Sequence, residues 1–372
     1  MSFFSYLSVF NHSRINFPEP KILIRGTLCL SSPSLYFYSY GELLPIVEHN
    51  FKVFPNSSLI LKNYDFEWKT FENHGIFELH NGKAIGKGTY KTLEKSITSF
   101  YGNFEFQARN LNEFGLTKSE NGISLTCGSV NSYWWRYEVE GHIQFIVPQG
   151  VSDDCASENI MRILDPSYIS EKSDSKVSDL PIIKKPIMKN YTNEIRINAE
   201  YNKIILSRRL QVHMPLIFDL KSFHNSDSLQ VNRLKFKLRK SFTNEGTLYS
   251  EESLFIIAKS FVNQEDKQIG AMKDVYIETS DFANETKSIV FSQEGDIEVI
   301  STSIDNQKAT IHAGGILKLN SNNNINNQGG LLQAMDSTRE SLIKCHEFVN
   351  SEQIETKIFI FRYDIITSTQ EL

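Results

Sequence analysis

The stretch INNQGGLLQA, from Ile325 to Ala334, decides the fold. Its Asn-Asn-Gln-Gly-Gly segment lies between two apolar runs, and this arrangement predicts a turn that joins two strands. The turn belongs either to one isolated hairpin or to one corner of a repeating structure. The rest of the chain distinguishes these possibilities, because only a repeating structure has the same corner elsewhere in the sequence.

The corner pattern occurs seven times in the second half of the chain. Each occurrence has an asparagine with Phe or Ile two positions before it, and successive asparagines are 19, 19, 21, 22, 21 and 23 residues apart. Asparagine tolerates the left-handed backbone conformation of a sharp bend, and stacked asparagines pass amide hydrogen bonds between coils. We therefore predict a structural corner ladder of Asn225, Asn244, Asn263, Asn284, Asn306, Asn327 and Asn350. We predict a core stack of Phe223, Phe242, Phe261, Phe282, Ile304, Ile325 and Phe348.

Other apolar residues follow the same period. One returns four to six positions after each asparagine, and we expect a strand to start there. A further apolar pair precedes most of the later asparagines, as in Leu254 and Ile256, while Leu317 and Leu319 are displaced by one residue, as a single insertion would do. Alternation with period two predicts strands with one buried face. The residues after the asparagines are Leu229, Leu248, Ile269, Ile289, Ile311, Leu331 and Ile354.

These units predict an all-β solenoid. A unit of about 20 residues with two or three short strands cannot bury its apolar face alone, so it stacks on copies of itself. Helical repeats need longer units and a 3.6-residue periodicity, whereas strands separated by Asn and Gly corners are typical of a parallel β-helix. Each coil would add roughly 4.8 Å along the axis, which is the spacing between strands of a sheet.

Composition and charge exclude several classes of function. Hydrophobic residues make up 40% of the 372 residues, which suffices for a packed core. The net charge of -5 gives no basic field, so we expect no nucleic-acid partner. The four cysteines form no C-x-x-C pair, which argues against a structural zinc site. No apolar run approaches about 18 residues, so we predict no transmembrane helix.

The chain divides into three regions by pattern. Residues 1–150 have alternating apolar positions almost throughout, and Phe71-Glu-Asn73 follows the style of the later corners. We interpret this region as irregular coils of the same β-helix, with a separate β-rich domain as the alternative. Residues 151–190 are polar and form one irregular insertion with a short helix, and residues 191–372 contain the repeats.

The insertion has one predicted helix. Residues from about Asp154 to Leu164 fit a short helix with Ser152 or Asp153 as its N-cap, and Pro166 follows its end. The remainder of the insertion is rich in Ser, Asp and Lys, so we expect a loop that leaves one corner of the coils as a surface excursion.

Two stretches outside the repeats raise the question of a binding site. The densest aromatic cluster contains Trp134, Trp135 and Tyr137, which are candidates for recognition of a carbohydrate or a protein. Alternation places the two tryptophans on opposite faces of a strand, so at least one belongs to the core in the competing interpretation. The stretch GKAIGKGT, residues 82–89, is similar to a phosphate-binding loop but lacks its G-x-x-x-x-G-K-[ST] spacing, and we interpret it as a turn.

No set of residues predicts catalysis. Glu138, Glu140 and His142 are a possible acid/base group, but nothing supplies a nucleophile or a partner geometry. His74 and His80 are metal-type ligands, yet the apolar residues among them leave no assured chelating face. We therefore expect no catalytic residues, no metal and no cofactor, and we predict that the protein is not an enzyme.

The repeats resemble a known family. The unit NQKATIHAGGILKLNSNNNINNQGGLLQA, from Asn306 to Ala334, resembles the haemagglutinin repeats of filamentous haemagglutinins and of contact-dependent growth inhibition effectors. The resemblance covers roughly residues 225–350. It implies a right-handed parallel β-helix that a dedicated outer-membrane pore exports from Gram-negative bacteria by two-partner secretion. The implied role is structural and adhesive, in cell contact through a surface receptor or matrix component or in presentation of a toxin tip.

Members of this family begin with a signal peptide and a secretion domain, and the effector members end in a toxin module. This sequence shows none of these segments, so we expect a fragment of a longer protein that is secreted or lies at the bacterial surface. Two alternatives stay open. One is a receptor-binding region of such an effector, and the other is a β-helix enzyme that degrades polysaccharide.

Overall fold

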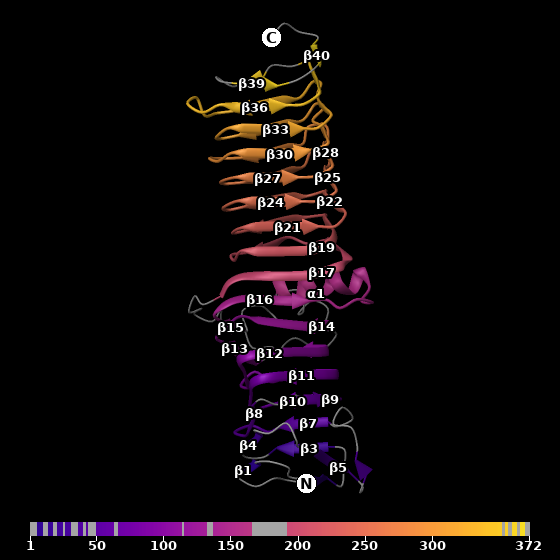
Figure 1. Ribbon diagram of the computed structural model, residues 1–372, viewed down its shortest axis with the longest axis vertical. Helices are drawn as coiled ribbons and strands as arrows, with labels where there is room; N and C mark the ends of the chain where they lie inside the picture. Colours follow the sequence, from indigo (N-terminus) through magenta and orange to yellow (C-terminus); the bar gives the residue numbers. More distant parts are fainter. Residues whose placement is uncertain are drawn as a thin grey trace. The chain divides into compact units, whose positions relative to one another are not determined.

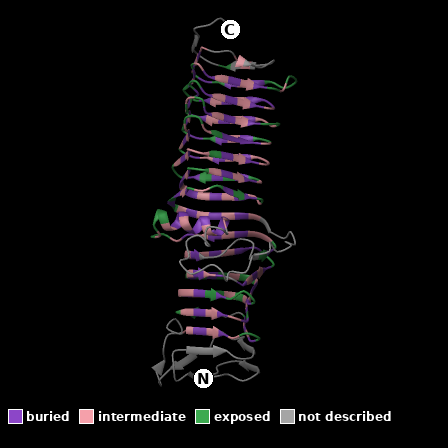
Figure 2. Ribbon diagram, turned by 180° about the vertical axis from the view of Figure 1, so that it is seen from behind, coloured by how far each residue is buried: buried purple, intermediate pink, exposed green. Residues whose placement is uncertain are grey.

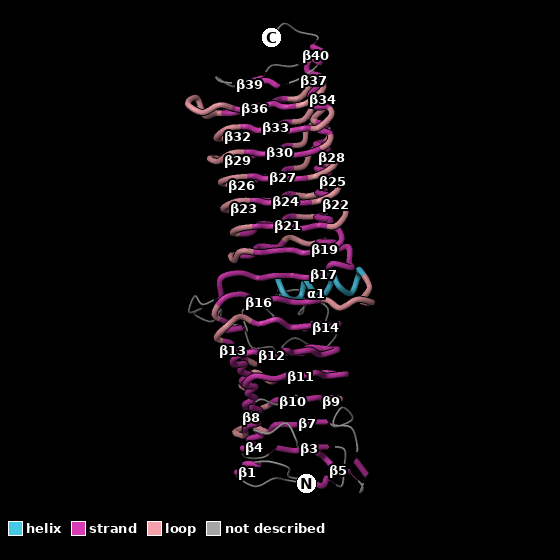
Figure 3. Tube along the Cα trace, in the orientation of Figure 1, coloured by secondary structure: helices cyan, strands magenta, loops and turns pink. Residues whose placement is uncertain are grey.

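The structure is a computed structural model in which β-strands pair in parallel. Among the described strand pairs, only that of β5 (Tyr36–Ser39) with β6 (Glu42–Leu43) is antiparallel. The strands form a solenoid of about 12 turns that are ~21 residues apart, which confirms the predicted all-β parallel solenoid. Figure 3 shows the strands and α1 (Asp153–Leu164), the one helix of the described residues. The described residues are 50–62, 66–113, 115–131, 137–165 and 192–351, with strands between 6 and 43 and between 354 and 368.

The right-handed sense of winding stays a prediction, one that agrees with the strong preference of parallel strands for right-handed connections. Two compact units divide the chain, and each is described by itself. The first unit contains Met1–Val151 and Glu158–Arg196, and the second contains Ser152–Ser157 and Ile197–Leu372. The boundaries 150 and 190 of the predicted regions stay predictions.

Each coil of the second unit places three short strands on three faces, and Figure 1 shows these coils in successive layers from red to yellow. The first face holds β18 (Leu210–Val212), β20 (Ser228–Val231), β23 (Thr247–Ser250), β26 (Gln268–Ala271), β29 (Ile289–Ser292), β32 (Thr310–Ala313), β35 (Leu331–Ala334) and β38 (Ile354–Glu355). The second holds β21 (Leu234–Leu238), β24 (Leu254–Ile257), β27 (Val275–Glu278), β30 (Ile297–Ser301), β33 (Leu317–Ser321), β36 (Ser341–Lys344) and β39 (Phe359–Arg362). The third holds β22 (Ser241–Asn244), β25 (Ser260–Asn263), β28 (Asp281–Asn284), β31 (Ser303–Asp305), β34 (Asn324–Asn327), β37 (Glu347–Asn350) and β40 (Ile365–Ser368), and β19 (Leu216–Asn225) continues from the second face to the third.

Along most strands every second residue is buried in the core of the coil, and Figure 2 colours these residues purple. The parallel register then sets each inward side chain against the same position of the next coil. Phe261 pairs with Phe242 on one side and with Phe282 on the other. Their rings stack almost parallel, with centroids 5.3 and 4.8 Å apart. The core is therefore a set of continuous columns of like side chains.

The register differs from the sequence prediction at two strands. Ile269 pairs with Val290, and Ile311 pairs with Leu332. The buried positions of β29 and β35 are thus Val290 and Leu332, whereas Ile289 and Leu331 are half-buried outward positions. Both strands begin with two consecutive apolar residues. In each strand only the second of these two side chains points into the core.

The predicted single-residue insertion is confirmed. Leu317 and Leu319 of β33 pair with Ile297 and Val299 of β30, as the apolar pattern requires. The next pairs are Ser301 with Ser321 and Ile304 with Ile325, so the later coil has one residue more between its second and third faces. The extra residue is absorbed in an Asn-rich turn.

The first unit also consists of parallel coils, but its strands are less regular. Phe71 pairs with Phe51 and with Tyr90, so the predicted early corner does lie in a stacked column. Aromatic rings in this core cross edge to face, as in Phe71 and Tyr90 at 5.1 Å between centroids. The strands are β1 (Tyr6–Val9), β2 (Arg14–Phe17), β3 (Lys21–Ile24), β4 (Thr27–Leu30), β7 (Asn50–Val53), β8 (Ser58–Lys62), β9 (Phe66–Trp68), β10 (Thr70–Asn73), β11 (Ile76–Thr92), β12 (Ile97–Asn112), β13 (Leu116–Ser119), β14 (Ile123–Asn131), β15 (Tyr137–Val139) and β16 (Gly141–Ile146), and β17 (Thr192–Leu206) follows the insertion.

Helix α1 confirms the helix that the sequence predicts. Ser152 is its N-cap, because its hydroxyl Oγ accepts a hydrogen bond from the amide of Cys155 at 3.3 Å and its carbonyl accepts one from Ala156 at 2.9 Å. Two aspartates in the first turn complement the helix dipole. Most of the predicted loop, residues 166–191, lies outside the described residues.

The core columns lead to a first prediction. Phe261→Asp should place an unpaired carboxylate between two stacked phenylalanines and lower the free energy of unfolding by about 4 kcal/mol or more. Phe255→Asp is the matched control, because Phe255 is an outward, half-buried residue of the same coil. Urea unfolding followed by circular dichroism measures both, and an equal loss in the two variants would contradict the assignment of the inward face.

Candidate functional site

The seven predicted corner asparagines lie in one hydrogen-bonded column. Each side-chain amide Nδ2 donates to the Oδ1 atom of the next asparagine, from Asn225 through to Asn350. The six donor–acceptor distances are 2.7, 2.9, 2.9, 2.8, 2.7 and 2.7 Å. All seven side chains are at most 6% exposed. A continuous chain of amide hydrogen bonds therefore runs through the interior of the corner, and we name it the asparagine ladder.

The ladder amides of five coils also close their own corner, because each donates to a backbone carbonyl two to four residues later. Asn263 Nδ2 donates to the carbonyl of Lys267, which follows the bend in the same coil, and to the carbonyl of Ile289 in the next coil, both at 3.2 Å. One amide group thus serves backbone acceptors that the bend removes from the strand ladder. Buried polar groups that are fully bonded in this way specify one geometry, because every alternative leaves a donor or acceptor unpaired.

The backbone of the corner corrects one part of the sequence interpretation. No ladder asparagine adopts a positive φ; the left-handed residues follow two or three positions later. They are Asp266, Lys287, Lys308 and Gly329, with φ of 61°, 61°, 54° and 69°. Asparagine is therefore needed for its side-chain hydrogen bonds and not for backbone tolerance. Gly330 has a separate role, because a Cβ there would lie 2.2 Å from the carbonyl oxygen of Asn306.

The ladder has a distinct beginning. Asn225 donates to Asn244, but its own Oδ1 atom is buried and accepts no hydrogen bond from the described residues. The preceding coil passes this corner at Leu206, whose carbonyl accepts the amide of Ser226 at 2.8 Å. A leucine cannot donate to the orphan acceptor. The regular repeat pattern of the second unit therefore starts at Asn225, where the side-chain chemistry of the corner changes from apolar to amide.

The predicted core stack lies beside the ladder. Its seven residues are two positions before the asparagines, and each is at most 2% exposed. Ile304 and Ile325 continue the column after the phenylalanines, and Phe348 pairs with Ile325 in the following coil. The ladder and the stack thus occupy neighbouring inward positions of the third face.

The predicted recognition residues are only partly described. Trp134 and Trp135 lie outside the described residues. Tyr137 begins β15, and its backbone pairs with Thr117 of β13. Their role in recognition stays a prediction.

The other sequence candidates do not assemble into a site among the described residues. Glu138 forms an ion pair with Lys118 at 3.0 Å. Among the described residues, no hydrogen bond or ion pair joins Glu138 to His142. His80 Nε2 lies 3.2 Å from Glu78 Oε2, and its ring stacks on that of Tyr101. The part of the chain that the structure describes has no group of three or more His, Cys, Asp or Glu side chains that could hold a metal. Residues 82–89 lie in β11 and not in the predicted turn.

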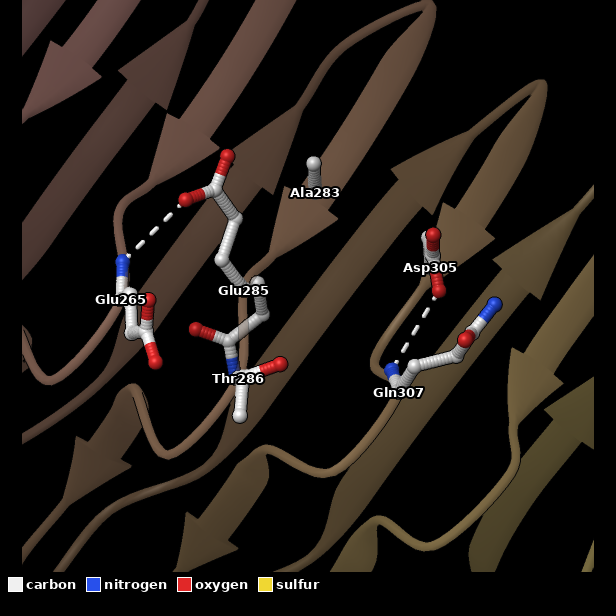
Figure 4. A pocket seen from close by; sticks show the side chains of 7 residues that line it. Glu265, Ala283, Glu285, Thr286, Asp305 and Gln307 are labelled. Atoms are coloured by element: carbon white, nitrogen blue, oxygen red, sulfur yellow. Dashed lines mark hydrogen bonds between the residues drawn. The ribbon is translucent and has the colours of Figure 1, made fainter.

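An acidic pocket of about 270 Å³ lies at the corners of three successive coils, and sequence reasoning missed it (Figure 4). Glu265, Glu285 and Asp305 line it from equivalent turns. Glu285 Oε2 accepts the amide of Glu265 at 3.2 Å, and Asp305 Oδ1 accepts that of Gln307 at 3.2 Å. These carboxylates satisfy turn amides, which is the usual role of acidic residues at bends.

The asparagine ladder gives a second prediction. Asn306→Val should remove the acceptor of Asn284 Nδ2 and the donor to Asn327 Oδ1, which leaves buried polar groups unpaired. The expected loss in free energy of unfolding is about 2–4 kcal/mol. Asn323→Val, at an exposed turn position nearby, is the control and should change it by less than about 0.5 kcal/mol. Chemical denaturation measures both, and a neutral Asn306→Val variant would refute the ladder's contribution.

His142 gives a prediction about pH. Burial lowers its pKa, and the positive charge of Arg196 lowers it further. The unfolded chain, with a histidine pKa of about 6.5, then binds a proton more readily than the folded chain, so stability should fall as pH drops below that value. His142→Gln should lose less stability than the unaltered protein between about pH 7.5 and about pH 5. An NMR titration that gives His142 a pKa above 6.5 would overturn this account.

Comparison with known proteins supports one family. Residues 284–333, which contain three successive corners of the ladder, match the family model of the haemagglutinin repeat. No curated protein and no solved structure matches the chain. No helix among the described residues is long and apolar enough to cross a membrane. The ladder geometry and the repeat match agree on the same coils, and the match supports a filamentous haemagglutinin-like β-helix over residues 284–333.

Proposed function

We propose that the chain is a structural and adhesive segment of an exported haemagglutinin-like filament, which mediates cell contact or presents a toxin tip. The observation that carries the proposal is the unbroken asparagine ladder, which passes through the coils of residues 284–333 that match the haemagglutinin repeat. Coils of this kind satisfy their backbone hydrogen bonds on their neighbours, so repetition adds length and requires no cofactor. The ladder and core positions have an architectural role, and the outward positions are free to vary.

The pattern of contacts supports export of an unfolded chain. Each described coil of the second unit pairs with the coil before it, and ladder partners are only 19 to 23 residues apart. Folding therefore needs no partner from far along the sequence and can proceed coil by coil as a chain emerges from a pore. Among the described residues, Cys127, Cys155 and Cys345 form no disulfide with one another, so folding of these coils needs no such link. We accordingly propose an outer-membrane secretion pore as one partner and the cell surface or the medium as the location.

Adhesion requires a second partner, a cell-surface receptor or a matrix component. Outward positions of neighbouring coils differ in chemistry, as Lys235, Phe255 and Tyr276 do on the second face. A regular scaffold with variable outward residues is suited to binding extended ligands. The receptor-binding alternative places recognition at Trp134 and Trp135, and the polysaccharide-degrading alternative requires turnover of a sugar polymer.

A binding assay tests the proposal. The purified, folded chain should bind saturably to host or bacterial cells or to immobilised matrix, and it should release no unsaturated sugar from acidic polysaccharides. Trp134→Ala with Trp135→Ala should leave this binding within about twofold if many outward positions share it, and should abolish it if the chain is a receptor-binding region. The absence of binding to any of these surfaces would reject the adhesive role, and release of unsaturated products would reject the non-enzymatic one.

A further inference from the structure

A β-bulge in the first unit creates a positively charged pocket. Gly86 pairs with Trp68 on one side and Ala108 on the other, while Thr89 pairs with Asn110. Two residues of β11, Lys87 and Gly88, therefore lie opposite one residue of the preceding coil, Lys69, and one residue of the following coil, Arg109. Bulges are uncommon between parallel strands and often re-aim side chains beside functional sites.

The bulge depends on glycine at position 88. A Cβ there would lie 2.0 Å from the carbonyl oxygen of Lys69 and would collide with the backbone of the neighbouring coil. With glycine, the extra residue packs close to that backbone. A hollow of about 500 Å³ forms beside it, and its lining side chains are Lys69, Thr70, Lys87, Thr89, Arg109 and Asn110.

The three cations of this pocket lack the carboxylate partners that three other lysines of the unit have. Lys52 pairs with Glu72 at 2.8 Å, Lys83 with Glu105 at 3.1 Å, and Lys118 with Glu138 at 3.0 Å, in each case across neighbouring coils. Among the described residues, no carboxylate lies within ion-pair distance of the three pocket cations. They project from adjacent coils whose strands are spaced at roughly 4.8 Å, so a bound anion would relieve their mutual repulsion.

Neutral donors complete the pocket. Asn110 Nδ2 donates to Thr89 Oγ1 at 3.4 Å, which leaves one amide hydrogen of Asn110 and the hydroxyl hydrogen of Thr89 for a ligand. The hydroxyl of Thr70 donates to Asn50 Oδ1 at 2.5 Å and is already used. Two neutral donors beside three cations suit an anion with several oxygens.

We propose that this bulge pocket binds a phosphomonoester on a small hydroxylated body, such as a sugar phosphate. A phosphomonoester carries close to two negative charges at pH 7, which matches a triple cation better than a carboxylate or a sulfate ester with one. Its three terminal oxygens accept from Lys69, Lys87 and Arg109, and Arg109 offers a planar pair of donors. The volume exceeds that of a phosphate alone, and the amide and hydroxyl groups of the lining can bond a hydroxylated remainder of the ligand.

This inference goes beyond the structural and adhesive role and does not depend on it, because the pocket lies in the first unit and outside the matched repeat segment. It also gives a use to the stretch GKAIGKGT, whose Lys87, Gly88 and Thr89 contribute to the pocket as bulge and strand residues. The anion is held by side chains of three coils and not by a phosphate-binding loop.

Calorimetric titration of the whole chain at low salt tests the proposal. Glucose 6-phosphate should bind about tenfold more tightly than glucose 6-sulfate, which has the same shape and one charge less, and glucose should not bind measurably. Affinity for glucose 6-phosphate should fall as pH drops through about 6, where the phosphate loses its second charge while lysine and arginine stay protonated. Equal affinity for the two esters would overturn the proposal.

Charge-matched variants locate the site. Lys87→Gln with Arg109→Gln should weaken binding of glucose 6-phosphate by at least about tenfold, since each exposed ion pair contributes on the order of 1 kcal/mol. Lys83→Gln with Lys118→Gln removes the same charge from paired lysines of the same unit and should change affinity by less than about twofold. If both double variants lose the same affinity for glucose 6-phosphate, binding depends only on the net charge of the protein, and the proposed site is rejected.

A second arm identifies the source of the phosphomonoester. Phosphatidylcholine vesicles that contain phosphatidic acid present the group on a membrane, and plain phosphatidylcholine vesicles are the control. Binding to glucose 6-phosphate alone assigns a soluble ligand, and binding to the phosphatidic acid vesicles as well assigns a membrane-borne one. The unfolding midpoint of the protein sample shows that it is folded under the conditions of the assay. If the folded protein then binds neither glucose 6-phosphate nor the phosphatidic acid vesicles, the proposal is wrong.

Discussion

The structure of the second unit depends on one interaction, the hydrogen bond from a buried asparagine amide to the asparagine of the next coil. A parallel solenoid must bend at fixed points, and each bend removes backbone groups from the strand ladder. The ladder amides bond these groups and at the same time fix the register of consecutive coils. Because the side-chain period of a strand is two, the fixed register also decides which side chains enter the core. The phenylalanine column and the three faces follow from that alignment.

The sequence revealed the second unit because the chemistry of its corners repeats. An asparagine with Phe or Ile two positions before it returns every 19 to 23 residues, so the solenoid, the coil length and the inserted residue before Ile325 were predictable. The inward-facing residues of β29 and β35 were not predictable, because each strand begins with two adjacent apolar residues. Either of the two could face the core, and only the packing of the coils decides which one does. The left-handed positions were also assigned wrongly. Any of several residues can occupy them, as Asp266 and Lys287 do, so they leave no uniform signal in the sequence.

The first unit shows why a solenoid escapes detection when its corners vary. The position of Asn73 is occupied by Val53 in the preceding coil and by Thr92 in the following one. Asn73 Oδ1 accepts the amide of Gly75 at 3.1 Å, and the Thr92 hydroxyl accepts the amide of Gly115 at 2.9 Å. Different side chains thus satisfy the same kind of backbone group. The bulge pocket was unpredictable for a related reason, since it arises from register between three coils and not from spacing within one stretch.

Hydrogen exchange of the asparagine side-chain amides tests the central claim most directly. NMR of protein labelled with ¹⁵N at asparagine separates the amide protons of the seven ladder residues from those of exposed asparagines such as Asn323. The account predicts that the ladder amides from Asn225 to Asn327 exchange far more slowly, because each is buried and donates to the next coil. Exchange of the ladder amides at the rate of Asn323 in the folded protein would show that the corners are held by something else.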